Sequence, residues 1–167
     1  MHFSIATAAR IAEEFSLKPV LIHATEGYLL ADILAQKQIP AIVGPLIGTR
    51  CKPELRGQSA ENAAKLKAAG VSVAICTDHP EVPIAYLPTS GVVAQKGGLS
   101  EEDALAALTC TAAQIAGIAD RVGKIAVGMD ADLQLYPKNT NPLALESEPL
   151  WVMIDGKQAN ETEEIRV

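Results

Sequence analysis

Short runs of apolar residues recur along the first half of the chain and have the length of β-strands. They comprise residues 20–22, 41–43 and 71–76. Each run is uninterrupted rather than alternating, which is typical of strands that are buried on both faces of a parallel sheet. The pattern therefore predicts three parallel strands.

The segments around these runs carry apolar residues at helical spacing. Residues 5–15 are alanine-rich and amphipathic, and residues 26–37 and 59–69 also favour helices. Ser100, followed by three acidic residues, can cap a further helix, and a shorter one is expected to reach Ile115. Because helices and strands alternate, the chain is predicted to contain parallel βαβ units.

Two stretches rich in glycine and proline interrupt this order. Residues 44–57 predict a long irregular loop, and a loop of that length in a compact domain is usually functional or mobile. Residues 79–98 have a similar composition, so no regular element is expected there before the helix at Ser100.

The pattern changes after Gly117. Residues 124–128, 132–136 and 150–154 are expected to form short strands, and Asp155-Gly156 favours a turn into a return strand. This part of the chain is therefore predicted to be a small antiparallel β unit, different in kind from the segment before it.

Composition narrows the function classes. The chain has 167 residues, of which 49% are hydrophobic, enough for one domain with a core. A complete (β/α) barrel needs more, about 250 residues. The net charge of −6 and the lack of a lysine or arginine cluster argue against nucleic acid as a partner. No apolar run is long enough to span a bilayer, and three scattered cysteines favour a reducing, cytoplasmic location.

Two of the apolar runs end in side chains that can bind a metal ion. The run at 20–22 leads into His23, and the run at 71–76 leads into Asp78. The carboxyl ends of parallel strands meet at one end of a sheet, where the chemistry of (β/α) barrels takes place. We therefore expect the two side chains to converge. The alternatives are a hydrogen-bonded, half-buried histidine and an acid that serves only in a turn.

Three stretches together resemble the C-terminal part of the metal-dependent amidohydrolases, with the imidazolonepropionase-related branch as the nearest group. Residues 21–28 are similar to the sixth barrel strand with its metal-binding histidine, and residues 74–80 to the eighth strand with its aspartate. Residues 122–133 resemble the stretch that leaves the barrel. The resemblance implies an α/β chain: a partial TIM-type barrel, about the last three βα units, in residues 1–118, and a small antiparallel β-sandwich module in residues 119–167.

By this resemblance the chain is expected to belong to an enzyme class that hydrolyses C–N bonds in amides or cyclic amides. His23 and Asp78 would bind a divalent metal, with zinc as the expected ion. Asp78 would also be catalytic, taking a proton from the attacking water and passing it to the leaving nitrogen. His79, Arg50 and Glu26 are secondary candidates for substrate contact or for orienting the ligands. His79 is expected to orient Asp78 or line the pocket rather than bind the metal, while the alternatives are an early helix acid for Glu26 and a solvated loop charge for Arg50.

The chain departs from the family pattern upstream of His23. The first-strand H-x-H pair, the bridging lysine or acid and the fifth-strand histidine have no clear match, and His2 is the only earlier histidine. Because catalytic zinc usually has three protein ligands, this C-terminal fragment is expected to be inactive alone and to lack the metal. The rival interpretation is a truncated or split segment that acts only as a structural or interaction piece.

A partial barrel also has consequences for partners. It would expose unpaired strand edges and an apolar inner face. The chain is therefore expected to form homo-oligomers or to dock on a complementary chain. A small amide-type molecule is the expected substrate of the family, and neither nucleic acid nor a membrane is expected as a partner.

Overall fold

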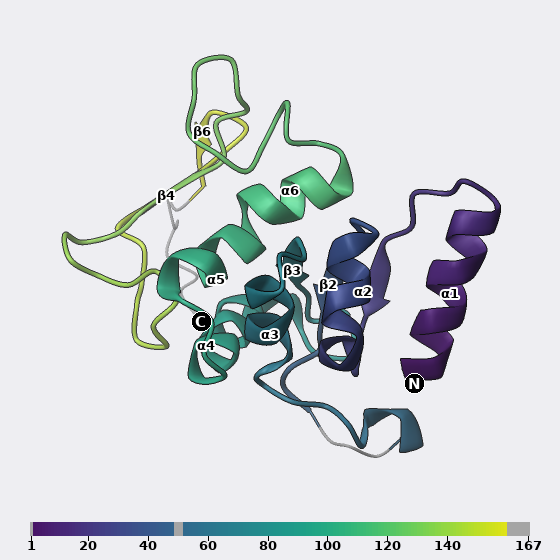
Figure 1. The fold of residues 1–167 in the computed structure, drawn as a ribbon. Coiled ribbons are helices and arrows are strands. Elements are labelled where there is room, and N and C mark those ends of the chain that lie inside the picture. Colours follow the sequence, from purple (N-terminus) through teal and green to yellow (C-terminus); the bar gives the residue numbers. More distant parts are fainter. Residues whose placement is uncertain (1, 49–51, 160–167) are drawn as a thin grey trace.

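The computed structural model describes residues 2–48 and 52–159. They form a parallel sheet with helices on one face, a group of helices that follows it, and a small antiparallel sheet (Figure 1). The parallel sheet has three strands in the order β1-β2-β3, namely β1 (Leu21–His23), β2 (Ala41–Val43) and β3 (Val73–Ile75). The three predicted parallel strands are confirmed. Within the described residues the sheet is open, so the barrel is not closed.

One face of the parallel sheet is well packed. Ala41 and Val43 of β2 are buried together with Leu34 and Leu66 in a single hydrophobic core. Leu34 belongs to α2 (Ala31–Gln36), which follows the short 3-10 helix η1 (Gly27–Leu30). Leu66 belongs to α3 (Asn62–Ala68), which follows the 3-10 helix η2 (Pro53–Leu55). Helices that cover one face of a parallel sheet are what βαβ units require.

The opposite face of the sheet is open by comparison. Successive side chains of a strand point to opposite faces, so Ile22 and Ile42, which are in register, lie on the face away from α2 and α3. Ile22 is 62% exposed, although it stands in the middle of a strand. The inner face that a closed barrel would bury is therefore left without cover at β1.

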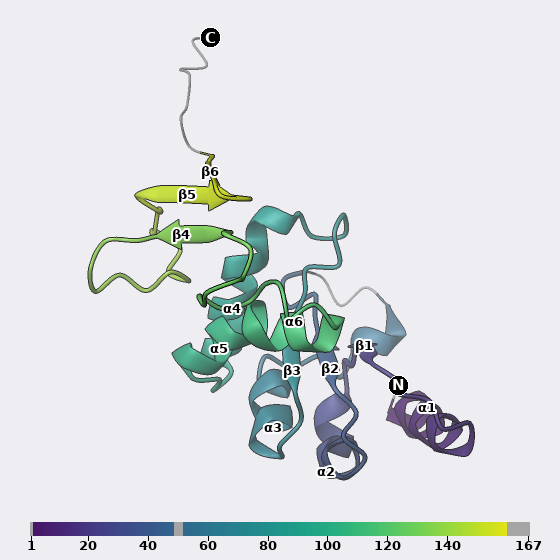
Figure 2. The same ribbon diagram turned by 90° about the horizontal axis from the view of Figure 1, so that it is seen from above.

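Helix α1 (His2–Glu14) lies beside the β1 end of the sheet (Figure 2). It buries Ile5, Ala9 and Ala12 along one side. These positions follow the spacing of an amphipathic helix, so the predicted helix is present. Phe3 remains exposed on its other side.

The segment after β3 differs from the expectation of an irregular region. It forms η3 (Ile84–Tyr86) and the ten-residue helix α4 (Leu87–Lys96). Pro88 lies in the first turn of α4, where a proline needs no amide partner. Gly91 is buried, and a Cβ there would come within 3.1 Å of a methyl group of Leu108 and 3.2 Å of one of Leu143. Here proline starts a helix and glycine permits close packing, so neither breaks it.

Two further helices follow, α5 (Glu101–Leu108) and α6 (Cys110–Ala116). The Ser100 hydroxyl accepts a hydrogen bond from the Asp103 amide at 3.0 Å, so the predicted cap is present. Asp103 also pairs with Lys67 at 2.7 Å. The Lys67 ammonium, and then the Ser100 hydroxyl, hold the pKa of Asp103 below its ordinary value. These contacts join the start of α5 to α3.

The last part of the described chain forms one antiparallel sheet with β4 (Leu133–Leu135), β5 (Trp151–Ile154) and β6 (Lys157–Gln158). Asp155 and Gly156 both have positive φ, as the tight turn between β5 and β6 requires. Among the described residues this is a single sheet, whereas a sandwich of two packed sheets was expected. The boundary at residues 118 and 119 stays a prediction.

The strand predicted at residues 124–128 is wrong. This segment turns, with Met129 donating its amide to the Ala126 carbonyl at 3.2 Å. Ile125 and Val127 are fully exposed because no neighbouring strand pairs with them. Alternating apolar residues favour a strand only where a partner strand lies in reach.

Among the described residues, no helix combines the length and the apolar character needed to cross a bilayer.

The Ser100 cap can be tested by Ser100→Ala. The variant leaves the first turn of α5 without its side-chain acceptor, so we expect the free energy of unfolding to fall by about 1 kcal/mol. Urea titration followed by circular dichroism measures the change. The control is Ser72→Ala, because Ser72 is also exposed and caps no helix. Equal losses in the two variants would show that the cap contributes nothing.

Candidate functional site

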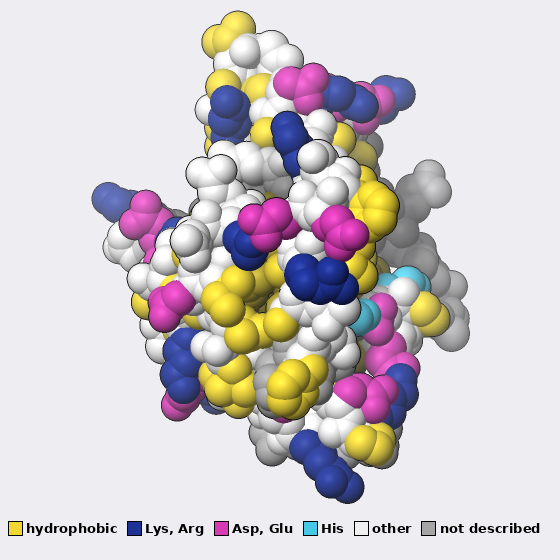
Figure 3. Space-filling model, turned by 45° about the vertical axis from the view of Figure 1, so that its right-hand side comes forward, with side chains coloured by type: hydrophobic (Ala, Val, Ile, Leu, Met, Phe, Trp, Pro, Cys, Tyr) yellow, Lys and Arg dark blue, Asp and Glu magenta, His cyan; other side chains and the backbone are white. Residues whose placement is uncertain are grey.

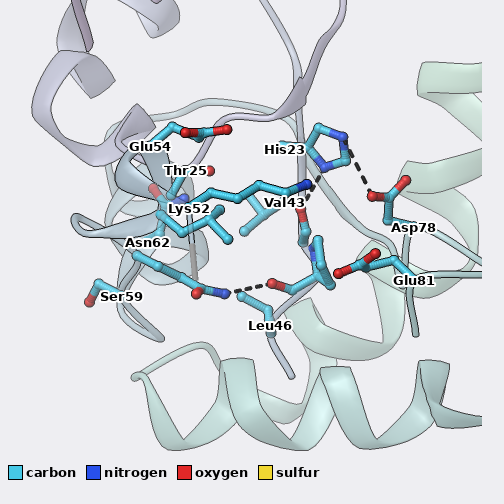
Figure 4. A pocket seen from close by; sticks show the side chains of 14 residues that line it. His23, Thr25, Val43, Leu46, Lys52, Glu54, Ser59, Asn62, Asp78 and Glu81 are labelled. Atoms are coloured by element: carbon cyan, nitrogen blue, oxygen red, sulfur yellow. Dashed lines mark hydrogen bonds and ion pairs between the residues drawn. The ribbon is translucent and has the colours of Figure 1, made fainter. Parts of the chain in front are cut away.

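His23 and Asp78 lie at the carboxyl end of the parallel sheet. His23 is the last residue of β1, and Asp78 follows the end of β3. Nε2 of His23 and Oδ2 of Asp78 are 3.9 Å apart, although β2 lies between the two strands (Figure 4). Both side chains remain partly exposed. The two candidates singled out from strand-end positions therefore lie together.

The segment that follows β2 lets the two side chains meet across it. Gly44 has φ +146, and a Cβ at this position would overlap the carbonyl oxygen of Cys76. Only glycine accommodates that close approach of the two chains. The Gly44 carbonyl in turn lies 2.8 Å from Nδ1 of His23. The ends of all three strands are therefore linked at one point.

This contact determines the protonation pattern of the His23 ring. A carbonyl oxygen can only accept a hydrogen bond, so Nδ1 carries the proton in the pair with Gly44. In the neutral imidazole, Nε2 then keeps its lone pair. Nε2 is also the ring nitrogen that is paired with the Asp78 carboxylate, at 3.9 Å from Oδ2. The arrangement is the one found for metal-binding histidines whose second nitrogen is held by a carbonyl.

The backbone bends sharply where both side chains leave the sheet. His23 has φ 69, Ala24 has φ 39 and Asp78 has φ 56, all in the left-handed region that residues other than glycine rarely adopt. Such residues persist only where surrounding contacts hold them, and they are frequent at functional sites. The site thus combines unusual backbone with converging polar groups.

A cavity of about 170 Å³ opens between the loops that follow the three strands (Figure 4). Val43, Leu46 and Leu55 form apolar parts of its wall, while Lys52 and three carboxylates contribute the charged groups. The full lining comprises His23, Thr25, Val43, Gly44, Pro45, Leu46, Lys52, Glu54, Leu55, Gln58, Ser59, Asn62, Asp78 and Glu81. This volume and this mixture suit a small polar molecule.

The secondary candidates lie less centrally. His79 is exposed and does not line the cavity, although it follows Asp78 directly. Glu26 also lies outside the lining and packs against Gly57, where a Cβ would overlap its carboxylate. Arg50 lies outside the described residues. Glu81, Gln58 and Asn62 line the cavity, yet the sequence patterns did not single them out.

Cys76 lies beside the site on the loop after β3. Burial raises the pKa of its thiol, and this outweighs the opposite effect of a hydrogen bond with the Asp78 backbone. The thiol is therefore uncharged at neutral pH. Within the part of the chain that the structure describes, no group of three or more His, Cys, Asp and Glu side chains is placed to hold a metal ion. Among the described residues, His23 and Asp78 therefore form a pair of candidate ligands without a third such side chain in place.

Comparison with known proteins identifies the class. The amidohydrolase family model matches residues 5–159, and the chain therefore belongs to the amidohydrolase family. A solved amidohydrolase from Thermotoga maritima is 41% identical and superposes with a TM-score of 0.86, over 93% of this chain and 40% of that protein. An adenosine deaminase from Xanthomonas campestris, solved with bound zinc, shares the fold at 22% identity and a TM-score of 0.63, over 83% of this chain and 36% of that protein.

Curated relatives point to the same family. The imidazolonepropionase of Verminephrobacter eiseniae is 34% identical over 113 residues, which is 66% of this chain and 25% of the relative. The imidazolonepropionase of Stenotrophomonas maltophilia is 37% identical over 78 residues, which is 44% of this chain and 19% of the relative. The chain thus spans a quarter or less of the curated relatives it matches.

The role of Gly44 can be tested by Gly44→Ala, with Gly48→Ala as the matched control. Both glycines have φ +146, but a Cβ at Gly48 meets nothing within 4 Å. The control should lose about 1 kcal/mol of unfolding free energy from the backbone conformation alone. Gly44→Ala should lose about 3 kcal/mol or more because it also overlaps Cys76. Urea titration measures both, and equal losses would contradict the close approach.

Proposed function

We propose that this chain supplies His23 and Asp78 to the metal site of an amidohydrolase that cleaves C–N bonds in amides or cyclic amides. The observation that carries the proposal is the pair itself. Nε2 of His23 and Oδ2 of Asp78 face each other at 3.9 Å, while Nδ1 is held by Gly44. Membership of the amidohydrolase family supports the assignment of metal chemistry to this pair.

The donor set fits a divalent ion in type and spacing. Neutral imidazole and carboxylate are both zinc ligands, with bond lengths of about 2.0–2.2 Å. The gap of 3.9 Å is therefore within the reach of one ion bound to both groups. Zinc is the proposed ion, and a relative of the same fold was solved with zinc. Since catalytic zinc usually has three protein ligands, the proposal requires further ligands from outside the described residues.

The chain's own residues have distinct tasks in this proposal. A bound divalent ion supplies acidity, because it lowers the pKa of water to about 7. The Asp78 carboxylate accepts the proton that the attacking water loses as its oxygen adds to the amide carbon. Asp78 then gives this proton to the nitrogen as the C–N bond breaks. The Nδ1–H group of His23 donates its hydrogen bond to the Gly44 carbonyl throughout.

The cavity limits the substrate to a small molecule. Its volume is about 170 Å³, and Val43 and Leu46 form an apolar wall. Lys52, a cation among the described lining residues, is available to pair with a substrate carboxylate. The substrate proposed from these features is a small amide or cyclic amide. Its identity also depends on groups beyond the described residues.

Metal binding by the pair can be measured with purified chain, zinc and a chromophoric chelator in competition. His23→Ala and Asp78→Asn each remove one of two ligands, so we expect zinc affinity to fall at least tenfold, within the range of about 10–100-fold that losses around metal sites cause. His79→Ala is the matched control, because it removes a neighbouring histidine that lies outside the cavity. The same affinity in all four proteins would mean that bound zinc sits elsewhere and would refute the proposal.

A second candidate function is that of a non-catalytic structural or interaction piece. Two observations favour it: the ligand pair is incomplete among the described residues, and the open sheet face carries the exposed Ile22 of β1. Phe3 of α1 adds further exposed apolar surface. Hydrophobic side chains reach the surface in patches between charged ones on the face shown in Figure 3. An uncovered strand and apolar patches are typical of surfaces that pair with another chain.

This second candidate predicts association. We expect the purified chain to form dimers or larger species in size-exclusion chromatography with light scattering, because burying Ile22 removes apolar surface from water. Ile22→Lys should increase the dissociation constant at least tenfold. Leu145→Lys is the control, since Leu145 is also exposed but belongs to the segment between β4 and β5. A monomer at high protein concentration would argue against association through this face.

A further inference from the structure

A buried amide side chain contacts the loop that directly follows His23. Asn62, the first residue of α3, is 1% exposed and lines the cavity (Figure 4). Its Nδ2 donates to the Ala24 carbonyl at 2.9 Å, and its Oδ1 accepts from the Tyr28 amide at 2.9 Å. Ala24 lies in the loop that follows β1, and Tyr28 belongs to η1 at the end of that loop. One side chain therefore holds that loop at two points.

A second carboxamide from the same short segment holds the neighbouring loop. Nε2 of Gln58 donates to the Pro45 carbonyl at 2.6 Å. Pro45 follows Gly44, whose own carbonyl accepts the proton of His23 Nδ1. Gln58 and Asn62 thus reach two different loops, one that directly follows the histidine and one with its hydrogen-bond acceptor.

We propose that Gln58 and Asn62 are positioning residues that together orient the His23 imidazole. Asn62 restrains Ala24, directly after His23, where both residues have left-handed backbone. Gln58 restrains the Pro45 carbonyl, one peptide after the Gly44 carbonyl that accepts from His23. When both loops are held, Nδ1–H continues to donate to the Gly44 carbonyl, and the Nε2 lone pair stays directed toward Asp78.

This role differs from ordinary stabilisation in what it predicts. Backbone groups near the cavity could be satisfied by many side chains, and any of them would stabilise the fold. We call Gln58 and Asn62 together the brace. If the brace acts on the imidazole, it also determines which ring nitrogen carries the proton. The consequence for metal affinity rests on the proposed function, whereas the consequence for the tautomer does not.

The tautomer of His23 is the first readout. Long-range proton–nitrogen NMR of the full chain labelled at histidine distinguishes the two tautomers, and His79→Ala assists the assignment. In the unmodified chain we expect the Nδ1-protonated form to dominate. Gln58→Met removes the donor to Pro45, and Asn62→Asp removes the donor to Ala24 while it keeps the acceptor for Tyr28. We expect the Nδ1-protonated population to fall at least twofold in each.

Zinc affinity is the second readout, and it should fall by about 10–100-fold in the same variants. The matched control is Asn141→Ala, because Oδ1 of Asn141 accepts from the Leu143 amide at 2.8 Å, away from the cavity. It should lose stability in a thermal melt without altering the tautomer or the zinc affinity.

The outcomes separate the two ideas. If folded Gln58→Met and Asn62→Asp keep the tautomer of the unmodified chain, the brace is refuted. If Asn62→Asp does not fold, the tautomer in Gln58→Met alone tests the brace, because the Gln58 side chain is only half-buried. If His23→Ala and Asp78→Asn leave zinc affinity unchanged while the tautomer still depends on Gln58, the proposed function fails and the brace stands.

Discussion

The site depends on the close approach of two backbone segments at the end of the sheet. Gly44 lies so near the Cys76 carbonyl that no Cβ fits between them. Because the chain turns in this way, the Gly44 carbonyl reaches Nδ1 of His23 at 2.8 Å. The close packing of the segments after β2 and β3 therefore also orients the His23 side chain at the end of β1. The chemistry of the site follows from how tightly the strand ends pack.

The two faces of the parallel sheet support the site unequally. On one face, fully buried Leu34 and Leu66 pack against β2, so the strands that carry the site stand on a formed core. On the other face, Ile22 remains largely exposed in mid-strand. A metal site needs rigid support for each ligand and also enough ligands. The packed face supports the strand ends that carry His23 and Asp78, and in the proposed function the further ligands come from outside the described residues.

The sequence predicted the features that depend on local pattern. Uninterrupted apolar runs identified the strands, and the strand-end rule identified His23 and Asp78. The sequence pattern could not predict α4. Gly91 permits close packing against Leu108 and Leu143, and these tertiary contacts cannot be read from the local sequence. The hydrogen bonds of Gln58 and Asn62 are equally non-local. They reach backbone groups 13 and 38 residues away, and no spacing along the chain signals them.

The length of the gap between His23 and Asp78 supports the proposed metal role over a direct hydrogen bond between the two side chains. A histidine that only paired with an aspartate would donate to it directly, at about 2.7–3.2 Å between heavy atoms. The observed separation of 3.9 Å is longer, and Nδ1 is already engaged with Gly44. With the ring proton on Nδ1, the Nε2 lone pair and the carboxylate are both acceptors. Two acceptors held face to face repel each other unless a cation or a proton lies between them. In the proposed function, the brace around His23 therefore maintains an arrangement that favours a cation between Nε2 and the carboxylate.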